Sequence, residues 1–156
     1  MLFRSDAKLS NASFEMGGVA PWQKYEATSN LTTYQITSRA KDGAWFSEAN
    51  TATVAGSVYQ DLAIAAQVGQ TYSLSMWVRS PSGAAITGNL VLWGLGGTNE
   101  NVTVPFTANG TWQLVNAPIT MRYSGHTFMR AQVYMMTVGQ NFDFDSAAVV
   151  LGSSRF

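Results

Sequence analysis

The chain has 156 residues and a mass of 16.9 kDa, a size that suits one domain with one hydrophobic core. Only 12% of the residues are charged, and nine Lys and Arg balance nine Asp and Glu. Binding to nucleic acid or to an anionic membrane surface relies on a basic excess, so this balance argues against both classes of partner. No apolar run approaches the ~18 residues that would span a bilayer. We therefore expect one soluble, neutral domain over residues 1–156.

Cysteine is absent, which removes disulfides, thiol catalysis and thiolate metal ligands together. The first eight residues carry Arg4, Asp6 and Lys8 and lack the apolar stretch of a signal peptide. We therefore expect no signal peptide in this chain. Three origins stay open: a trimmed secreted protein, a module of a longer chain, and an intracellular or virion protein.

Alternation with period two dominates the chain, whereas helical periodicity is hard to find. The longest tract that could be helical, residues 40–55, is broken by Asp42-Gly43 and ends in β-branched residues. Gly-containing turn signals separate the other segments. The predicted strands cover residues 57–64, 72–79, 89–95, 101–106, 112–121, 128–136 and 142–151. Seven or more short strands predict an all-β fold, a jelly-roll β-sandwich of two antiparallel sheets.

Two of these strands carry candidate ligand-binding side chains on the face opposite their apolar residues. Alternation in the segment 128–136 sends Arg130, Gln132 and Tyr134 away from the core, and in 72–79 it does the same for Trp77 and Arg79. Sugar rings stack on aromatic faces while their hydroxyls pair with planar donors and acceptors. We therefore predict that these five side chains line one glycan-binding face. The alternative is an ordinary polar outer face of an antiparallel sheet, with Trp77 as a core or interface residue.

Ordered sequence blocks resemble the carbohydrate-binding modules of the family 4/9/16/22 type. The opening block is Leu9-Ser-Asn-Ala-Ser-Phe-Glu15 followed by Trp22, and the central block is Gly69-Gln-Thr-Tyr-Ser-Leu-Ser-Met-Trp-Val-Arg79. Gly110-Thr-Trp112 and Phe142-Asp-Phe-Asp145 resemble the later blocks of these modules. The resemblance implies a jelly-roll sandwich whose concave face binds polysaccharide or oligosaccharide chains without catalysing a reaction.

The same resemblance implies a structural calcium ion that joins the first and last strands. Its pattern assigns side-chain ligands to Glu15 and Asp145 and backbone carbonyl ligands to Ser13 and Lys41. Calcium prefers several oxygen ligands, and Glu15 and Asp145 are two of only nine carboxylates. The alternative is that both are edge carboxylates paired with Arg or Lys.

Signatures of catalysis are weak, so we expect a protein that is not an enzyme. The only histidine, His126, lies in a predicted turn, where we expect it to be exposed and inert. Glu48 and Asp61 are the only carboxylate pair that we can nominate for glycoside hydrolysis, which needs two carboxylates roughly 5 to 10 Å apart. Tyr134 with Arg130 could mimic the site of a jelly-roll polysaccharide lyase.

Three functional classes follow. The first is a glycan-binding module, secreted or surface-exposed, within a larger polysaccharide-degrading enzyme or adhesin. The second is a structural jelly roll of a virion or cell surface that uses the same face for protein contacts. The third is a small lyase. The first predicts retention on a polysaccharide gel, which the second does not.

Overall fold

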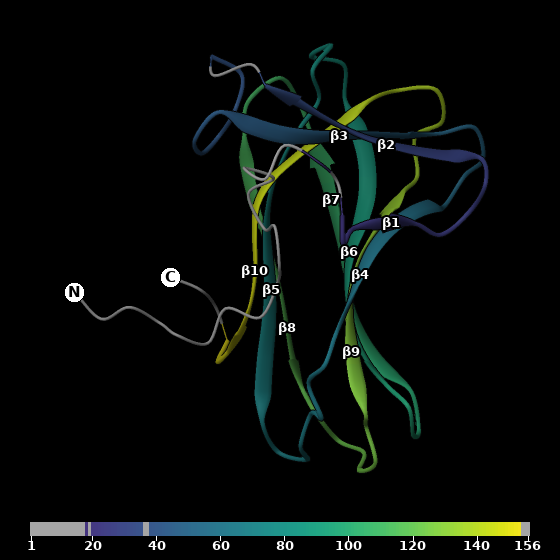
Figure 1. Cartoon of the computed structure of the whole chain (residues 1–156), viewed down its shortest axis with the longest axis vertical. Coiled ribbons are helices and arrows are strands. Elements are labelled where there is room, and N and C mark those ends of the chain that lie inside the picture. Colours follow the sequence, from purple (N-terminus) through teal and green to yellow (C-terminus); the bar gives the residue numbers. More distant parts are fainter. Residues whose placement is uncertain (1–17, 19, 36–37, 154–156) are drawn as a thin grey trace.

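The structure, a computed structural model, describes residues 18, 20–35 and 38–153. Two five-stranded antiparallel sheets face each other across one core (Figure 1), which confirms the predicted all-β jelly-roll sandwich. Sheet A has the strand order β1 (Gln23–Lys24), β4 (Gly56–Leu62), β9 (Phe128–Met135), β6 (Ile86–Leu95) and β7 (Glu100–Ala108). Sheet B has the order β2 (Ser29–Gln35), β3 (Trp45–Thr51), β10 (Phe142–Leu151), β5 (Thr71–Arg79) and β8 (Gln113–Thr120).

The core lies between the sheets and follows the period-two patterns of the sequence. Alternation in β5 and β9 directs one set of side chains inward, and these are almost fully buried, as predicted: Leu74, Met76, Val78, Met129, Ala131, Val133 and Met135. β10 is buried along both faces except at its last residue, Leu151. Its first half alternates Phe142 and Phe144 with Asp143 and Asp145, and only its second half, residues 147–151, is a continuous apolar run.

The first three strands were not among the predicted ones, although the tract 40–55 contains no helix, as its broken periodicity indicated. Residues 45–51 form β3, which pairs with β2 on one side and with β10 on the other. Phe46, Ala49 and Thr51 of β3 are buried. Long-range pairing with β10 supplies this context, and it overrides a weak local pattern. Within the described residues, no helix is long and apolar enough to cross a membrane.

Candidate functional site

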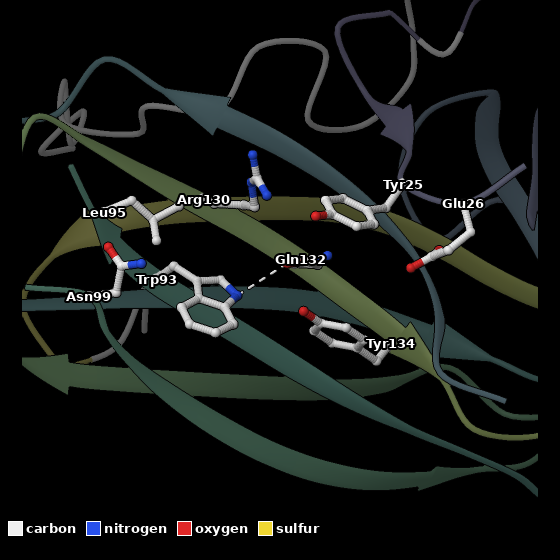
Figure 2. A pocket seen from close by; sticks show the side chains of 8 residues that line it. All are labelled: Tyr25, Glu26, Trp93, Leu95, Asn99, Arg130, Gln132 and Tyr134. Carbon is white, nitrogen blue, oxygen red and sulfur yellow. Dashed lines mark hydrogen bonds between the residues drawn. The ribbon is translucent and has the colours of Figure 1, made fainter.

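A groove runs over the outer face of sheet A and is the main candidate site. Its first part, a hollow of about 270 Å³, is lined by Tyr25, Glu26, Trp93, Leu95, Asn99, Arg130, Gln132 and Tyr134 (Figure 2). A second hollow of the same volume shares Trp93 and Tyr134 with the first and extends to Asn101 and Thr103 of β7. A third shares Asn89 and Met136 with the second. The three hollows therefore form one continuous groove across β9, β6 and β7.

Strand register explains why these side chains lie next to one another. In the pairing of β9 with β6, Arg130 lies opposite Trp93, and Tyr134 lies opposite Asn89. The pairing of β6 with β7 places Trp93 opposite Asn101. Directly paired residues point to the same face of a sheet, so side chains from three strands form rows across the groove floor.

Gln132 connects the aromatic and polar parts of this floor. Its side-chain oxygen accepts a hydrogen bond from the indole Nε1 of Trp93 at 3.1 Å, and its Nε2 donates to Oγ of Ser57 at 2.8 Å. Gln132 is only 2% exposed. Figure 2 shows Trp93, Tyr25 and Tyr134 arranged around it. The orientation of the Trp93 ring is therefore fixed by a buried amide.

Arg130 lies at one end of the groove in a cluster of aromatic and acidic side chains. Its Nε and one terminal nitrogen donate to the two carboxylate oxygens of Asp61, at 2.6 and 3.1 Å. The guanidinium carbon lies 4.3 Å from the ring centroid of Tyr59 and 5.7 Å from that of Tyr25. Tyr25 is 60% exposed at this end. Arg130 is thus held rigid and its charge is offset by Asp61.

Tyr134 is a neutral phenol in this environment. Burial is the main cause that raises its pKa above 10.0, and the negative charge of Glu26 raises the pKa further. A phenol with a raised pKa is a poor general base near neutral pH. Together with the pairing of Arg130 to Asp61, this argues against the lyase alternative.

Trp77 and Arg79 do not share a face with the three predicted residues of β9, so the prediction of one common face was wrong. β5 pairs with β10 and β8 in sheet B, whereas β9 pairs with β4 and β6 in sheet A. Each strand points its polar set outward, as predicted, but the two outward faces lie on opposite sides of the sandwich. Arg130, Gln132 and Tyr134 line the groove, and their role in ligand binding stays a prediction.

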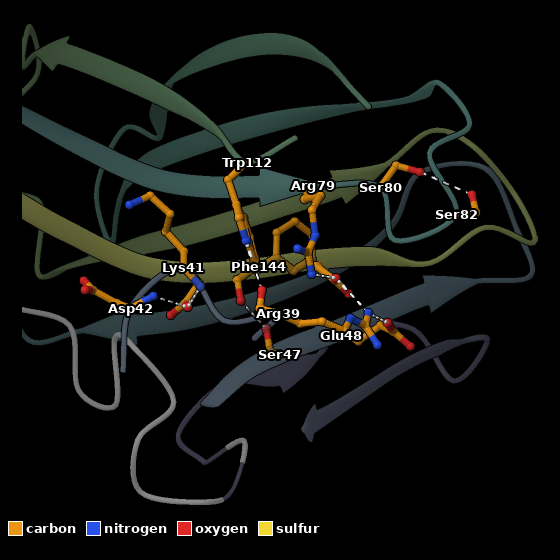
Figure 3. A network of polar contacts seen from close by, with 12 residues as sticks. Arg39, Lys41, Asp42, Ser47, Glu48, Arg79, Ser80, Ser82, Trp112 and Phe144 are labelled. Atoms are coloured by element: carbon orange, nitrogen blue, oxygen red, sulfur yellow. Dashed lines mark hydrogen bonds and ion pairs between the residues drawn. The ribbon is translucent and has the colours of Figure 1, made fainter. Parts of the chain in front are cut away.

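A charged network covers part of the outer face of sheet B (Figure 3). The fully buried carboxylate of Asp143 accepts hydrogen bonds from Arg39 at 3.0 Å and from Arg79 at 2.8 Å. Burial and the adjacent Asp143 carboxyl raise the pKa of Glu48 to about 7. The Arg79 guanidinium also lies 4.5 Å from the ring centroid of Trp112. Arg79 is therefore part of this ion-pair network.

Trp77 lies farther along the same outer face of sheet B. The Nζ of Lys41 lies 4.4 Å from the centroid of the Trp77 ring, so a cation covers that ring.

Glu48 and Asp61 do not lie close together. Glu48 belongs to β3 of sheet B and Asp61 to β4 of sheet A. The carboxylate pair nominated for glycoside hydrolysis is thus on opposite sheets.

Of the predicted calcium ligands, the structure describes Asp145 and Lys41, while Ser13 and Glu15 lie outside the described residues. Oδ2 of Asp145 accepts hydrogen bonds from the backbone amides of Lys41 and Asp42, at 2.9 and 3.0 Å. Asp145 is fully buried, and this burial raises its pKa to about 6 despite the three backbone amides that it accepts. No Lys or Arg within the described residues forms an ion pair with it. A buried carboxylate of this kind suits a hard cation.

No complete metal site is visible within residues 18, 20–35 and 38–153, where no three His, Cys, Asp or Glu side chains gather to hold an ion. The calcium ion thus stays a prediction whose remaining side-chain ligand, Glu15, falls outside that part of the chain.

His126 is buried rather than exposed, which corrects the expectation for this turn. Its Nε2 lies 2.8 Å from Oε1 of Glu100, and His126 is 4% exposed. Oε1 and Oε2 of Glu100 also accept the backbone amide of Arg122, and Oε1 that of Tyr123. The imidazole packs against Gly94, where a Cβ would come within 3.0 Å of it. The pair of Glu100 and His126 therefore joins the loop 122–126 to β7 and to Gly94 of β6.

Sequence reasoning missed Trp93, Glu26 and Tyr25. Trp93 shares its alternation with Asn89 and Val91 and could have been found from that pattern. Val91 made the outer set of this strand look apolar, and it is indeed buried. Tyr25 and Glu26 follow β1, which has only two residues and no readable alternation.

Comparison with known proteins identifies the family. The sequence profile of the CBM_4_9 family, described as a carbohydrate binding domain, matches residues 6–138. The chain belongs to this family, which agrees with the resemblance seen in its sequence blocks. No curated protein sequence matches the chain.

Solved structures share the whole fold at low sequence identity. The CBM22-1 xylan-binding domain of Paenibacillus barcinonensis Xyn10C superposes with a TM-score of 0.75 at 14% identity, covering 99% of each chain. The C-terminal family 22 carbohydrate binding module of Clostridium thermocellum Xyn10B superposes with a TM-score of 0.71 at 21% identity, covering 97% of this chain and 98% of that one. A cyclase from Fischerella sp. TAU also superposes, with a TM-score of 0.72 at 14% identity and coverage of 97% and 98%. These likenesses show the fold, which serves binding modules and at least one enzyme.

Proposed function

We propose that this domain binds uncharged polysaccharide or oligosaccharide chains in the groove of sheet A, without catalysis. The observation that carries the proposal is the arrangement of Trp93, Tyr25 and Tyr134 around fixed polar groups in one continuous groove. Membership of a carbohydrate-binding domain family supports it. The groove crosses three strands and is open, a shape that suits an extended chain of sugars better than a single small molecule.

Binding in this groove combines stacking with a few hydrogen bonds. An aromatic ring offers its face to the C–H groups of a sugar, and each hydrogen bond adds roughly 0.5–1.5 kcal/mol net. A ligand that makes only a few such contacts binds weakly, with a Kd on the order of micromolar to millimolar. A xylan-like chain is the first ligand to test, since a structural neighbour is named as a xylan-binding domain.

We propose further that calcium stabilises the domain through Asp145, with Glu15 as the second side-chain ligand and the backbone carbonyls of Ser13 and Lys41 as further ligands. The buried carboxylate of Asp145 and its raised pKa support this proposal. The ion would offset the charge of Asp145 and would not take part in sugar binding. We also propose that the domain acts outside the cell or on a surface, as a module of a larger enzyme or assembly, because polysaccharide is found there.

Affinity electrophoresis in native gels that contain xylan, β-glucan or mannan tests the proposed function. We expect retardation of the wild type in at least one gel, and loss of that retardation in Trp93→Ala. Trp77→Ala is the matched control, because it removes the same side chain from the opposite outer face. If the wild type ignores every neutral polysaccharide, the proposed function is overturned and the structural-protein alternative becomes the better one.

A further inference from the structure

Gln132 is closed to a ligand by its burial, although the sequence pattern placed it among the ligand-binding residues. It is 2% exposed, its oxygen is occupied by the indole of Trp93, and its nitrogen donates to Ser57. A buried amide with partners at both ends acts on its neighbours rather than on a ligand. Gln132 therefore determines where Trp93 lies.

The chain of hydrogen bonds continues from Ser57 to Glu26. The backbone amide of Ser57 donates to Oε2 of Glu26 at 2.6 Å, and its hydroxyl lies 3.4 Å from Oε1. The hydroxyl of Ser29 donates to Oε2 at 3.4 Å. Every link runs in the same direction, from Trp93 through Gln132 and Ser57 to the carboxylate of Glu26. Four segments of the chain thus hold one aromatic ring and one carboxylate in a fixed relation.

The Glu26 carboxylate lies in the groove and retains capacity to accept further hydrogen bonds. Most of its close contacts fall on Oε2, while Oε1 has only the 3.4 Å contact with Ser57 within the described residues. Figure 2 shows the carboxylate on the groove side of the sheet, facing the region of Tyr134. An ionised carboxylate only accepts hydrogen bonds. The partners that it suits are the hydroxyl donors of a sugar.

The charge balance of the groove favours ligands that carry no negative charge. Arg130 is the only cation among the residues that line its first hollow, and Asp61 already neutralises it through two hydrogen bonds. Glu26 leaves one uncompensated negative charge, and its field reaches the middle of the groove, where it raises the pKa of Tyr134. A uronate carboxylate placed there would be repelled.

We propose that Gln132 and Ser57 are positioning residues that hold Trp93 and Glu26 as one unit, and that Glu26 makes the groove select uncharged sugars over uronates. The inference rests on the proposed function of the same groove. It adds the residue that accepts sugar hydroxyls, the residues that position it, and the class of polysaccharide that it rejects.

Calorimetric titration with neutral xylo-oligosaccharides and with oligogalacturonates, at low and at high ionic strength, tests the inference. The variants are Glu26→Gln and Gln132→Met, and Glu48→Gln on the opposite sheet is the matched control. We expect Glu26→Gln to lose about tenfold or more in affinity for the neutral ligand, because charge-assisted hydrogen bonds are the stronger ones. It should bind oligogalacturonate more tightly than the wild type at low ionic strength, since the repulsion is gone. Glu48→Gln should match the wild type with both ligands.

The role of Gln132 has its own readout in the indole N–H resonance of Trp93. Gln132→Met should shift this resonance and weaken neutral binding, whereas Glu48→Gln should leave both unchanged. If the wild type binds neutral sugars but Glu26→Gln binds both ligands as the wild type does, the inference is overturned and the proposed function stands. If the wild type binds no sugar of either kind, the proposed function and the inference fail together.

Discussion

Nε2 of His126 and Oε1 of Glu100 lie 2.8 Å apart in a buried pair at the start of β7. Burial acts to raise the pKa of Glu100, but hydrogen bonds from His126 and from the amides of Tyr123 and Arg122 outweigh it and hold the pKa below 4.5. The ionised Glu100 is therefore the common acceptor for a side chain and two loop amides.

Loss of this acceptor should destabilise the domain. Glu100→Ala leaves His126 and two backbone amides without their partner, which we expect to cost about 3 kcal/mol of unfolding free energy, or roughly 6–12 °C in Tm at this chain length. Because the folded pKa is lowered, the contribution is present above pH 4.5 and is lost as the pH falls through the folded value. Thermal melts at pH 7 and below pH 4 measure both effects, with Asp61→Ala as the exposed control. A Glu100→Ala protein that melts like the wild type at pH 7 contradicts this role.

Glu48 should have the opposite effect on the pH dependence of stability. Its folded pKa of about 7 lies above the usual 4.5, so the native state holds its proton more tightly than the unfolded chain. The contribution to stability is present below pH 4.5 and is lost as the pH rises through 7. Glu48→Gln should therefore stabilise the protein at pH 8 relative to the wild type and give no such gain at pH 4. Equal differences between the two proteins at both pH values would refute this assignment.

Calcium should raise the melting temperature if Asp145 is a ligand. An ion that binds only the native state adds about 2.7 kcal/mol at a hundredfold excess over its Kd, or roughly 5–10 °C for a chain of this size. Melts with millimolar calcium and with chelator measure the difference. We expect Asp145→Asn to lose the rise in melting temperature with calcium, and Asp61→Asn to keep it. Identical melts of the wild type with calcium and with chelator, and no metal in elemental analysis, would contradict a calcium ion bound by Asp145.

Sequence patterns predicted the strand faces well but not which sheet each strand joins. Alternation correctly separated Met129 from Arg130 and Met76 from Trp77, because neighbouring residues of a strand point to opposite sides. Whether two outward faces coincide depends on long-range pairing. β5 and β9 never pair with each other, so Trp77 and Tyr134 lie on opposite faces of the sandwich.

Local patterns also failed where non-local contacts decide the environment. His126 follows Ser124-Gly125 and reads as an exposed turn residue, yet Glu100, 26 residues away in the chain, buries it. The pattern of β9 placed Gln132 on the groove side, as the structure does, but it did not show that Trp93 and Ser57 on neighbouring strands hydrogen-bond its amide. In both cases the alternation or turn was read correctly, and the partner could be found only from the pairing of strands.

Binding to a neutral polysaccharide should depend little on salt. Such a ligand releases no counterions and gains no long-range attraction, unlike a polyanion. Retardation in xylan gels should thus be nearly constant as the ionic strength rises within the range where the protein stays folded. A steep loss of binding with salt would indicate an anionic ligand and would contradict the assignment of neutral sugars to the groove.

The location of the ligand tests the central claim most directly. Each of the five tryptophans carries one indole N–H, and these give separate reporters on both outer faces in a ¹H–¹⁵N correlation spectrum. We expect a xylo-oligosaccharide titration to shift the resonance of Trp93 in the groove of sheet A and to leave those of Trp77 and Trp112 in place. Saturable shifts confined to Trp77 and Trp112 would place the sugar on sheet B and contradict the account.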